Sequence, residues 1–278
     1  MQKIITLIVM LAAGLSARAQ VAKDPGIPNP EAPVVFINLM GIVPEDIDQF
    51  VADWNERAKI MGQVPGYITA TLYRSLLSGA RYQLINIAQW QSYDAWVAAN
   101  NNPSYVKQLS NDLGHTVSIK PTQSFYRPAA WSTNTYVGSF PGSDKQPAAQ
   151  KGPSLQRVQK DPEIESPGLP FVFINLMEMS AEDISPFVLD WRVRSKIMGQ
   201  MPAAMGSTLY RALLPDNTYQ IVNVSQWQSY DGFIEANNNP AYAQELTSDL
   251  RHTPSIKLTR GFYRPVATYT HIYTDVPE

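Results

Sequence analysis

An asparagine and a tryptophan four residues apart, Asn86 and Trp90, are the clearest candidates for chemistry in the sequence. They lie in a largely apolar run, 81–90, that is typical of a β-strand. Side chains alternate along a strand, so the amide and the indole should share one face. A second amide, Asn38, is central in another apolar run, 34–40. Apolar pockets with a few convergent polar groups commonly bind small molecules. Alternatively, the two amides hydrogen-bond each other, as buried polar groups require.

The same polar set occurs a second time. Asn175, Asn223 and Trp227 repeat it at a constant spacing of 137 positions, with no gap. The whole repeated unit runs from about Pro33 to Pro128 and again from about Pro170 to Pro265. Units of roughly 95 residues are longer than solenoid repeats, so they indicate two similar domains.

Each unit predicts the element order β-α-β-β-α-β. In the first unit the expected strands are 34–40, 67–77, 81–90 and 118–127, with helices opening near Pro44 and Ser92. This is the ferredoxin-like arrangement, an antiparallel sheet with both helices on one face. Strands one and three are neighbours in it, which would place Asn38 beside Asn86. The bare sheet faces of two such units can cover each other, so we expect an α+β fold with two repeats packed sheet to sheet as an internal dimer. Equivalent segments at 131–136 and 269–273 predict short extra strands reaching the partner unit.

The N-terminal residues resemble an export signal. Lys3 precedes an apolar run, 4–15, and Ala17-Arg18-Ala19 is a small-x-small cleavage site. The alternative is a buried N-terminal helix. We expect an exported protein, periplasmic or secreted after cleavage. The predicted organisation is a signal at 1–19, a flexible lead-in at 21–32, domain 1 at 33–137, a flexible linker at 138–169 and domain 2 at 170–275.

Composition narrows the function classes. The chain has 278 residues, 44% hydrophobic and 17% charged, which is enough for two packed domains. A net charge of −2 without a basic run argues against nucleic acid as a partner. The absence of cysteine excludes thiolate chemistry and cysteine-based metal sites. No run after the signal is apolar enough to predict a membrane span.

The motif order resembles the antibiotic biosynthesis monooxygenase family. A strand, a Pro-Gly turn at 64–67, a Leu-Tyr-Arg strand and Asn-x-x-x-Trp-x-Ser before a helix carry the resemblance, which covers both units. The second unit departs at 202–204, where the usual glycine is absent. The resemblance implies the dimeric α+β barrel fold. It also implies a monooxygenase that uses O₂ on an aromatic or quinol-type small molecule without a cofactor.

The resemblance also implies roles for particular residues. In quinone-forming members, the paired Asn and Trp contact the substrate. The matching catalytic candidates are Asn86, Trp90, Asn223 and Trp227. Their N–H groups would stabilise the charge that develops on oxygen. Those enzymes also use an Arg on the second helix, but its place falls on Ser110 and Thr247, so that group is not carried over.

Further residues are expected around the pocket. The substrate-binding candidates are Asn38, Asn175, Tyr73, Tyr210, His115 and His252. The tyrosines could instead form exposed cross-strand pairs, and the histidines could simply end the second helix. Arg57 is expected on a solvated helix face, Trp54 in the core, and the asparagine triplets (100–102 and 237–239) in turns. His271 has no counterpart in the other unit, so no metal site is expected.

Two other functions fit parts of the sequence. A non-catalytic small-molecule-binding protein would keep the barrel and the pocket. A haem-degrading protein of the same fold would use Asn38, but its Trp and His would fall near Ala99 and Leu109. The expected partners are a small aromatic substrate and O₂, with an internal pseudo-dimer that leaves room for further homo-oligomerisation, and neither nucleic acid nor membrane.

Overall fold

The structure is a computed structural model that describes residues 20–112, 114–116, 118–135, 158–249, 252–253 and 255–271. The predicted export signal at 1–19 lies outside the described residues, and so does the part of the predicted linker up to residue 157. The chain divides into two compact units. Unit 1 comprises 1–127, 212–217 and 265–278, and unit 2 comprises 128–211 and 218–264. No helix among the described residues is long and apolar enough to cross a membrane.

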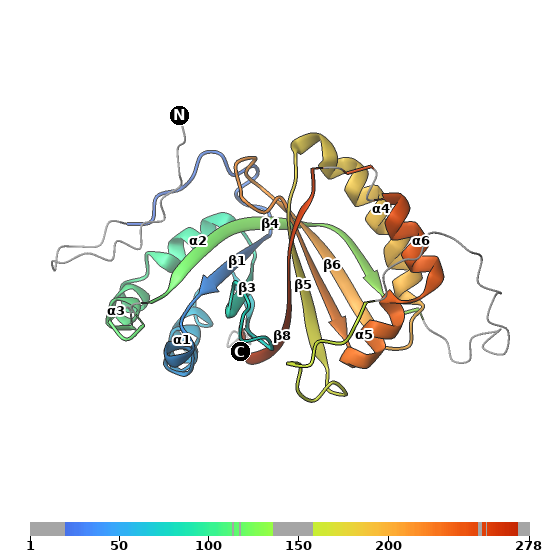
Figure 1. The fold of residues 1–278 in the computed structure, drawn as a ribbon. Coiled ribbons are helices and arrows are strands. Elements are labelled where there is room, and N and C mark those ends of the chain that lie inside the picture. Colours follow the sequence, from blue (N-terminus) through green and yellow to red (C-terminus); the bar gives the residue numbers. More distant parts are fainter. Residues whose placement is uncertain are drawn as a thin grey trace, which may run out of the picture. The chain divides into compact units, whose positions relative to one another are not determined.

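The predicted order β-α-β-β-α-β is found in both repeats (Figure 1). The first contains β1 (Val34–Gly41), a short 3₁₀ helix (Pro44–Asp46), α1 (Ile47–Met61), β2 (Tyr67–Ser75), β3 (Leu84–Trp90), α2 (Tyr93–Asn100), α3 (Pro103–Asp112) and β4 (Lys120–Thr133). The second contains β5 (Phe171–Glu178), α4 (Ala181–Gly199), β6 (Ala204–Ala212), β7 (Ile221–Trp227), α5 (Tyr230–Asn237), α6 (Pro240–Asp249) and β8 (Lys257–Thr270). In unit 1, α1, α2 and α3 lie on one face of the sheet, as Figure 1 shows.

The strand pairing confirms the predicted α+β barrel. β1 pairs antiparallel with β3 and β4, and β3 pairs with β2; in the second repeat β5 pairs with β7 and β8, and β7 pairs with β6. Among the described residues, the hydrogen-bonded order β1-β3-β2-β8-β5-β7-β6-β4 closes on itself. The register sets Asn38 directly opposite Asn86, and Asn175 opposite Asn223, as strand alternation predicted.

The last strand of each repeat is longer than expected. The segments predicted as separate short strands are the ends of β4 and β8, as far as the described residues extend. Pro128 lies just beyond Tyr126, the last β4 residue paired with β1, so its missing N–H breaks no bond to that strand. The end of β8 belongs to unit 1, where Thr268 contacts Thr71 of β2 at 3.2 Å between hydroxyl oxygens.

Two segments predicted to be flexible make specific contacts. The strap, residues 20–32, is held to unit 1 because Asn101 binds the backbone of Val21 on both sides. Val21 N donates to Asn101 Oδ1 over 2.8 Å, and Asn101 Nδ2 donates to Val21 O over 3.0 Å. Asp24 N also donates to the Tyr93 hydroxyl over 2.9 Å. The second repeat has the same clamp between Val158 and Asn238.

The asparagine triplet of the first repeat therefore does more than form a turn. Asn101 holds the strap, whereas Asn102 caps α3 through its side-chain oxygen, which accepts from Ser104 N over 2.9 Å. Asn100 Nδ2 donates to Trp96 O, one turn back on α2, over 2.8 Å. The sequence indicated only the turn, because the partner of Asn101 lies 80 positions away.

A glycine and an alanine exchange places between the repeats. Gly66 has a φ of 84°, and a Cβ there would lie 2.3 Å from Cβ of Ala95. The matching positions of the second repeat hold Ala203 and Gly232, and a Cβ on Gly232 would lie 2.1 Å from Cβ of Ala203. The second repeat lacks the usual glycine at 202–204, and Gly232 on α5 makes room for the methyl group of Ala203 instead.

Gly66→Ala should destabilise the protein by about 2–4 kcal/mol, because it combines left-handed backbone strain with an overlap of two methyl groups. Urea unfolding would measure the loss. Adding Ala95→Gly should restore only part of it, since the strain at residue 66 stays. Gly79→Ala is the matched control, because nothing lies within 4 Å of a Cβ there. Equal stability of the two single variants would contradict the argument.

Candidate functional site

A cavity of about 160 Å³ lies in unit 1, between the sheet and the three helices. Its wall is largely apolar, and aromatic rings contribute much of it. The rings include Phe36, Phe50, Trp54, Tyr67, Trp90 and Trp96. Trp54, which was expected in the core, therefore serves the cavity as well. Val21 of the strap also lines it, so the strap forms part of the wall.

Three polar atoms on the sheet side of this wall are buried without a protein partner among the described residues. They are Asn38 Oδ1, Asn86 Oδ1 and Trp90 Nε1. The two amide oxygens sit on residues directly opposite each other, yet neither is satisfied by the other amide. A buried polar atom without a hydrogen bond destabilises a protein by about 1–3 kcal/mol. Two buried acceptors and one buried donor in this wall thus lack a partner among the described residues.

Tyr67 fixes the indole. Its ring meets Trp90 edge-on, with the centroids 5.2 Å apart, and its hydroxyl donates to Tyr269 O over 3.0 Å. Burial is the main cause that raises the pKa of Tyr67 well above its usual range, so the side chain stays a neutral donor rather than a base.

Arg57 is the main functional residue that the sequence did not indicate. It was expected on a solvated helix face, but that prediction is wrong, because its side chain is buried in the cavity wall. Arg57 Nη1 donates to Asp112 Oδ2 over 2.5 Å, and Gln108 Nε2 donates to Asp112 Oδ1 over 2.8 Å. A guanidinium thus reaches the cavity from α1, although Ser110 occupies the position at which the family has an arginine on the second helix. Only the repetition of Arg57 and Asp112 as Arg194 and Asp249 could have signalled the pair.

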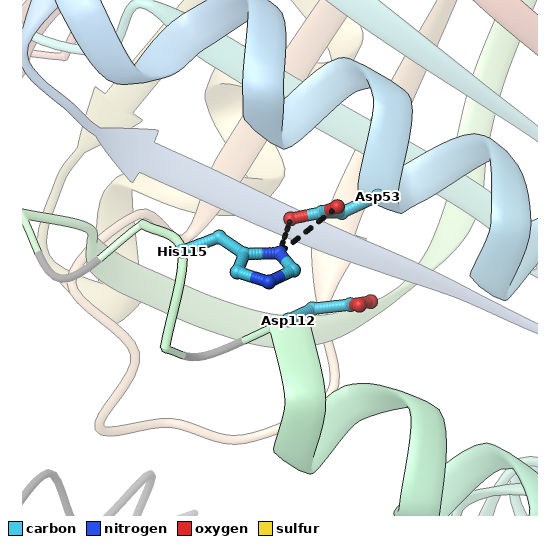
Figure 2. A group of neighbouring side chains, drawn as sticks. All are labelled: Asp53, Asp112 and His115. Carbon is cyan, nitrogen blue, oxygen red and sulfur yellow. Dashed lines mark hydrogen bonds and ion pairs between the residues drawn. The ribbon is translucent and has the colours of Figure 1, made fainter.

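His115 lies behind this pair, outside the cavity wall. Its Nδ1 is 3.1 Å from Asp53 Oδ2, and its side chain is half exposed (Figure 2). Asp53, Asp112 and His115 offer atoms within 4.8 Å of one another, a spacing that suits a metal ion. However, Gln49 and His115 already bind the oxygens of Asp53, while Gln108 and Arg57 bind those of Asp112. The arrangement is therefore a hydrogen-bonded network. His252 and Asp190 repeat its outer part at 3.0 Å.

Tyr73 does not join the cavity wall. It pairs with Ile85, one step from the pair between Leu72 and Asn86, so it projects from the other sheet face. Burial raises its pKa. The register of β2 shifts between Tyr67 and Thr69. This bulge explains why Tyr67 and Ala70, of opposite parity, both line the cavity. Tyr210 takes the corresponding place opposite Val222.

The second repeat changes the polar pattern. Asn223 Oδ1 accepts a hydrogen bond from Ser207 Oγ over 2.7 Å, and Ser207 replaces Ala70 of the first repeat. Asn175 Oδ1 and Trp227 Nε1 remain without a partner among the described residues. One of the two paired amides is therefore already occupied in unit 2, so the repeats are not chemically equivalent.

Asn101→Ala should release the strap from the cavity. Because two hydrogen bonds to Val21 are lost, exchange of the Val21 amide hydrogen should accelerate about tenfold or more, while the amides of β3 should stay protected. Hydrogen exchange resolved by residue would measure this. Asn238→Ala, which removes the same clamp in unit 2, should leave Val21 unchanged. Unaltered exchange at Val21 in Asn101→Ala would show that the clamp does not hold the strap.

Comparisons with known proteins agree with this fold. An anthrone oxidase-like protein has a TM-score of 0.59 and 14% identity over 87% of this chain and 94% of its own. A candidate monooxygenase from Fusobacterium nucleatum has a TM-score of 0.59 and 7% identity over 86% and 94%. One from Lactobacillus acidophilus has a TM-score of 0.54 and 11% identity over 87% and 97%. A comparison with curated proteins finds no match.

A family model matches part of the first repeat directly. The model for antibiotic biosynthesis monooxygenases matches residues 33–107, which contain both unpartnered amides and the indole of the cavity. The matched segment also carries Arg57 and the aromatic wall between β1 and α2. Over residues 33–107 the chain is therefore similar to the antibiotic biosynthesis monooxygenase family.

Proposed function

We propose that the cavity of unit 1 is the active site of a monooxygenase that acts with O₂ on a small phenol or quinol. The observation that carries the proposal is the set of polar atoms without a partner among the described residues, Asn38 Oδ1, Asn86 Oδ1 and Trp90 Nε1, in a largely apolar cavity with several aromatic rings in its wall. The family match of the same residues supports oxygen chemistry there.

Each polar atom has a role in this proposal. The amide oxygens accept hydrogen bonds from substrate hydroxyl groups and so orient the ring. The Trp90 N–H, fixed by Tyr67, donates to oxygen that becomes negatively charged as the substrate passes an electron to O₂. Such a preorganised donor in a site shielded from water stabilises charge more than it would in bulk solvent.

The reaction balances without an external reductant. A phenol exchanges the C–H bond para to its hydroxyl for a C=O bond. One atom of O₂ enters the product, and the other leaves as water with the hydrogens of the O–H and C–H bonds. The substrate supplies all four electrons, so the proposal includes neither a metal nor a flavin.

Oxygen uptake with isotope labelling tests the proposal. The purified chain should consume one O₂ per phenol, and one ¹⁸O atom from ¹⁸O₂ should appear in the quinone. Binding without uptake would reject the enzyme and favour the non-catalytic binding protein. A Soret band on addition of haem would instead favour the haem-binding alternative.

Export forms a separate part of the proposal. If residues 1–19 are a signal, N-terminal sequencing of the protein recovered outside the cytoplasm should begin at Gln20. Recovery of the uncleaved chain from the cytoplasm alone would reject export without affecting the proposed chemistry.

A further inference from the structure

We infer that the cavity of unit 1 selects a single aromatic ring with two adjacent hydroxyl groups, that is, a catechol. As a statement about the substrate this rests on the proposed function, although the binding preference can be measured separately. Three features support it, namely the size of the cavity, the pattern of its unpartnered atoms and the charge of its wall.

The size of the cavity favours one ring. Its volume is about 160 Å³, and an apolar protein cavity of about 150 Å³ is large enough to hold benzene. Pockets for larger, drug-sized ligands start at about 300 Å³. A fused three-ring compound would therefore require the strap or the helices to move.

The polar pattern favours adjacent hydroxyl groups. Asn38 and Asn86 are direct partners across β1 and β3, and opposed side chains of antiparallel strands start about 4.5–5.5 Å apart. Their two unpartnered oxygens are acceptors, so they need two donors from the ligand. Hydroxyl groups on adjacent ring carbons leave the same edge of the ring and can reach both amides. Hydroxyl groups in para positions point to opposite ends, so only one can reach this pair.

The indole N–H of Trp90 is then placed to donate at the side of the ligand ring opposite the two hydroxyl groups. Trp90 is four residues beyond Asn86 on the same face of β3, about 13 Å along the strand at 3.3 Å per residue. Its N–H is a donor and cannot replace either amide oxygen. It is therefore left for the ring edge opposite the two hydroxyl groups, where the incoming oxygen acquires charge.

The charge of the helix wall favours a neutral ring. The positive charge of Arg57 is paired with Asp112 at 2.5 Å, and the carboxylate of Asp53 lies beside them. No excess positive charge from this group is left to compensate a carboxylate on the ligand. A catechol that carries a carboxylate should therefore bind more weakly than catechol itself.

The second repeat supplies the test variant. Ser207 occupies the amide oxygen of Asn223, and Ala70 holds the equivalent place near Asn86. Ala70→Ser should recreate that hydrogen bond and remove one acceptor from the ligand. Ser207→Ala is the matched control, because it changes the same position of the other repeat and should leave the cavity of unit 1 as it is.

The decisive experiment is a binding series without oxygen, followed by tryptophan fluorescence and calorimetry. Catechol should bind at least about tenfold more tightly than hydroquinone, since hydroquinone leaves one acceptor unpaired. 1,2-Dimethoxybenzene, which has no donor, should bind more weakly still. Ala70→Ser should reduce the affinity for catechol about tenfold and that for hydroquinone by less. Ser207→Ala should change neither.

The outcomes separate this inference from the proposed function. Equal binding of catechol and hydroquinone, or of catechol to Ala70→Ser and the unmodified chain, would overturn the catechol inference. Incorporation of one ¹⁸O atom from ¹⁸O₂ into the quinone formed from phenol would still support the monooxygenase. Selective binding of catechol without oxygen uptake after air is admitted would uphold the inference and reject the enzyme. Failure of every ligand to bind would overturn both.

Discussion

Asn86→Ala should lower the turnover of a phenolic substrate by about 10²-fold, the loss typical of a substrate that is misplaced by about 1 Å at the reacting centre. The Asn86 side-chain oxygen is buried in the cavity wall without a partner among the described residues, so its hydrogen bond is available only to a ligand. The truncation also frees the ring to rotate away from Trp90. Steady-state oxygen uptake would measure kcat and KM, and kcat should carry most of the loss.

Asn223→Ala is the control for this experiment. It removes the same side chain at the same place in the second repeat, where Ser207 already binds the amide oxygen. Turnover should then stay within about twofold of the unmodified chain. Equal losses in the two variants would show that the repeats act together, and full activity of Asn86→Ala would remove this amide from the mechanism.

Asp112→Ala should destabilise the protein by about 3–5 kcal/mol, because it leaves the guanidinium of Arg57 buried and unpaired. Asp112 is only 2% exposed and Arg57 only 8%, so water cannot replace the lost carboxylate. Urea unfolding monitored by circular dichroism would give the difference. The double variant Arg57→Met/Asp112→Leu, which removes both charges and fills similar volume, should recover most of the stability.

An exposed ion pair in the same unit provides the comparison. Arg74 Nη1 lies 2.7 Å from Asp48 Oδ1, but the side chains are 42% and 86% exposed. Asp48→Ala should therefore change the free energy of unfolding by less than about 1 kcal/mol. If Asp112→Ala loses no more stability than Asp48→Ala, or if the double variant is no more stable than Asp112→Ala, then burial does not explain the contribution of the Arg57–Asp112 pair to stability.

The amide pair could be predicted because it depends on local rules. Strand periodicity placed Asn38 and Asn86 on inward faces, and the element order made their strands neighbours, which the register confirms. The repeat, read without a gap, then extended the pattern to Asn175 and Asn223.

Other features could not be predicted, because they depend on distant partners or on one irregular residue. Helical spacing from Phe50 and Trp54 puts Arg57 on the buried face of α1, but its charge suggested a solvated position, because the carboxylate that pairs with it lies 55 positions later. The proline-rich composition of the strap suggested a mobile segment, although Asn101 fixes it. Simple alternation would place Tyr67 and Tyr73 on the same face of β2, but the bulge at the start of the strand leaves Tyr67 in the cavity wall and Tyr73 on the opposite face.

The exchanged glycine and alanine have a consequence for inheritance. Two related segments in one gene can recombine, and a crossover between the codons for residues 66 and 95 would join the β2 region of one repeat to the α2 region of the other. The products would bring together Ala203 and Ala95, whose methyl groups would collide, or Gly66 and Gly232, which would leave a gap. The contact therefore disfavours gene conversion across this region, and it helps the two repeats to keep diverging within a single chain.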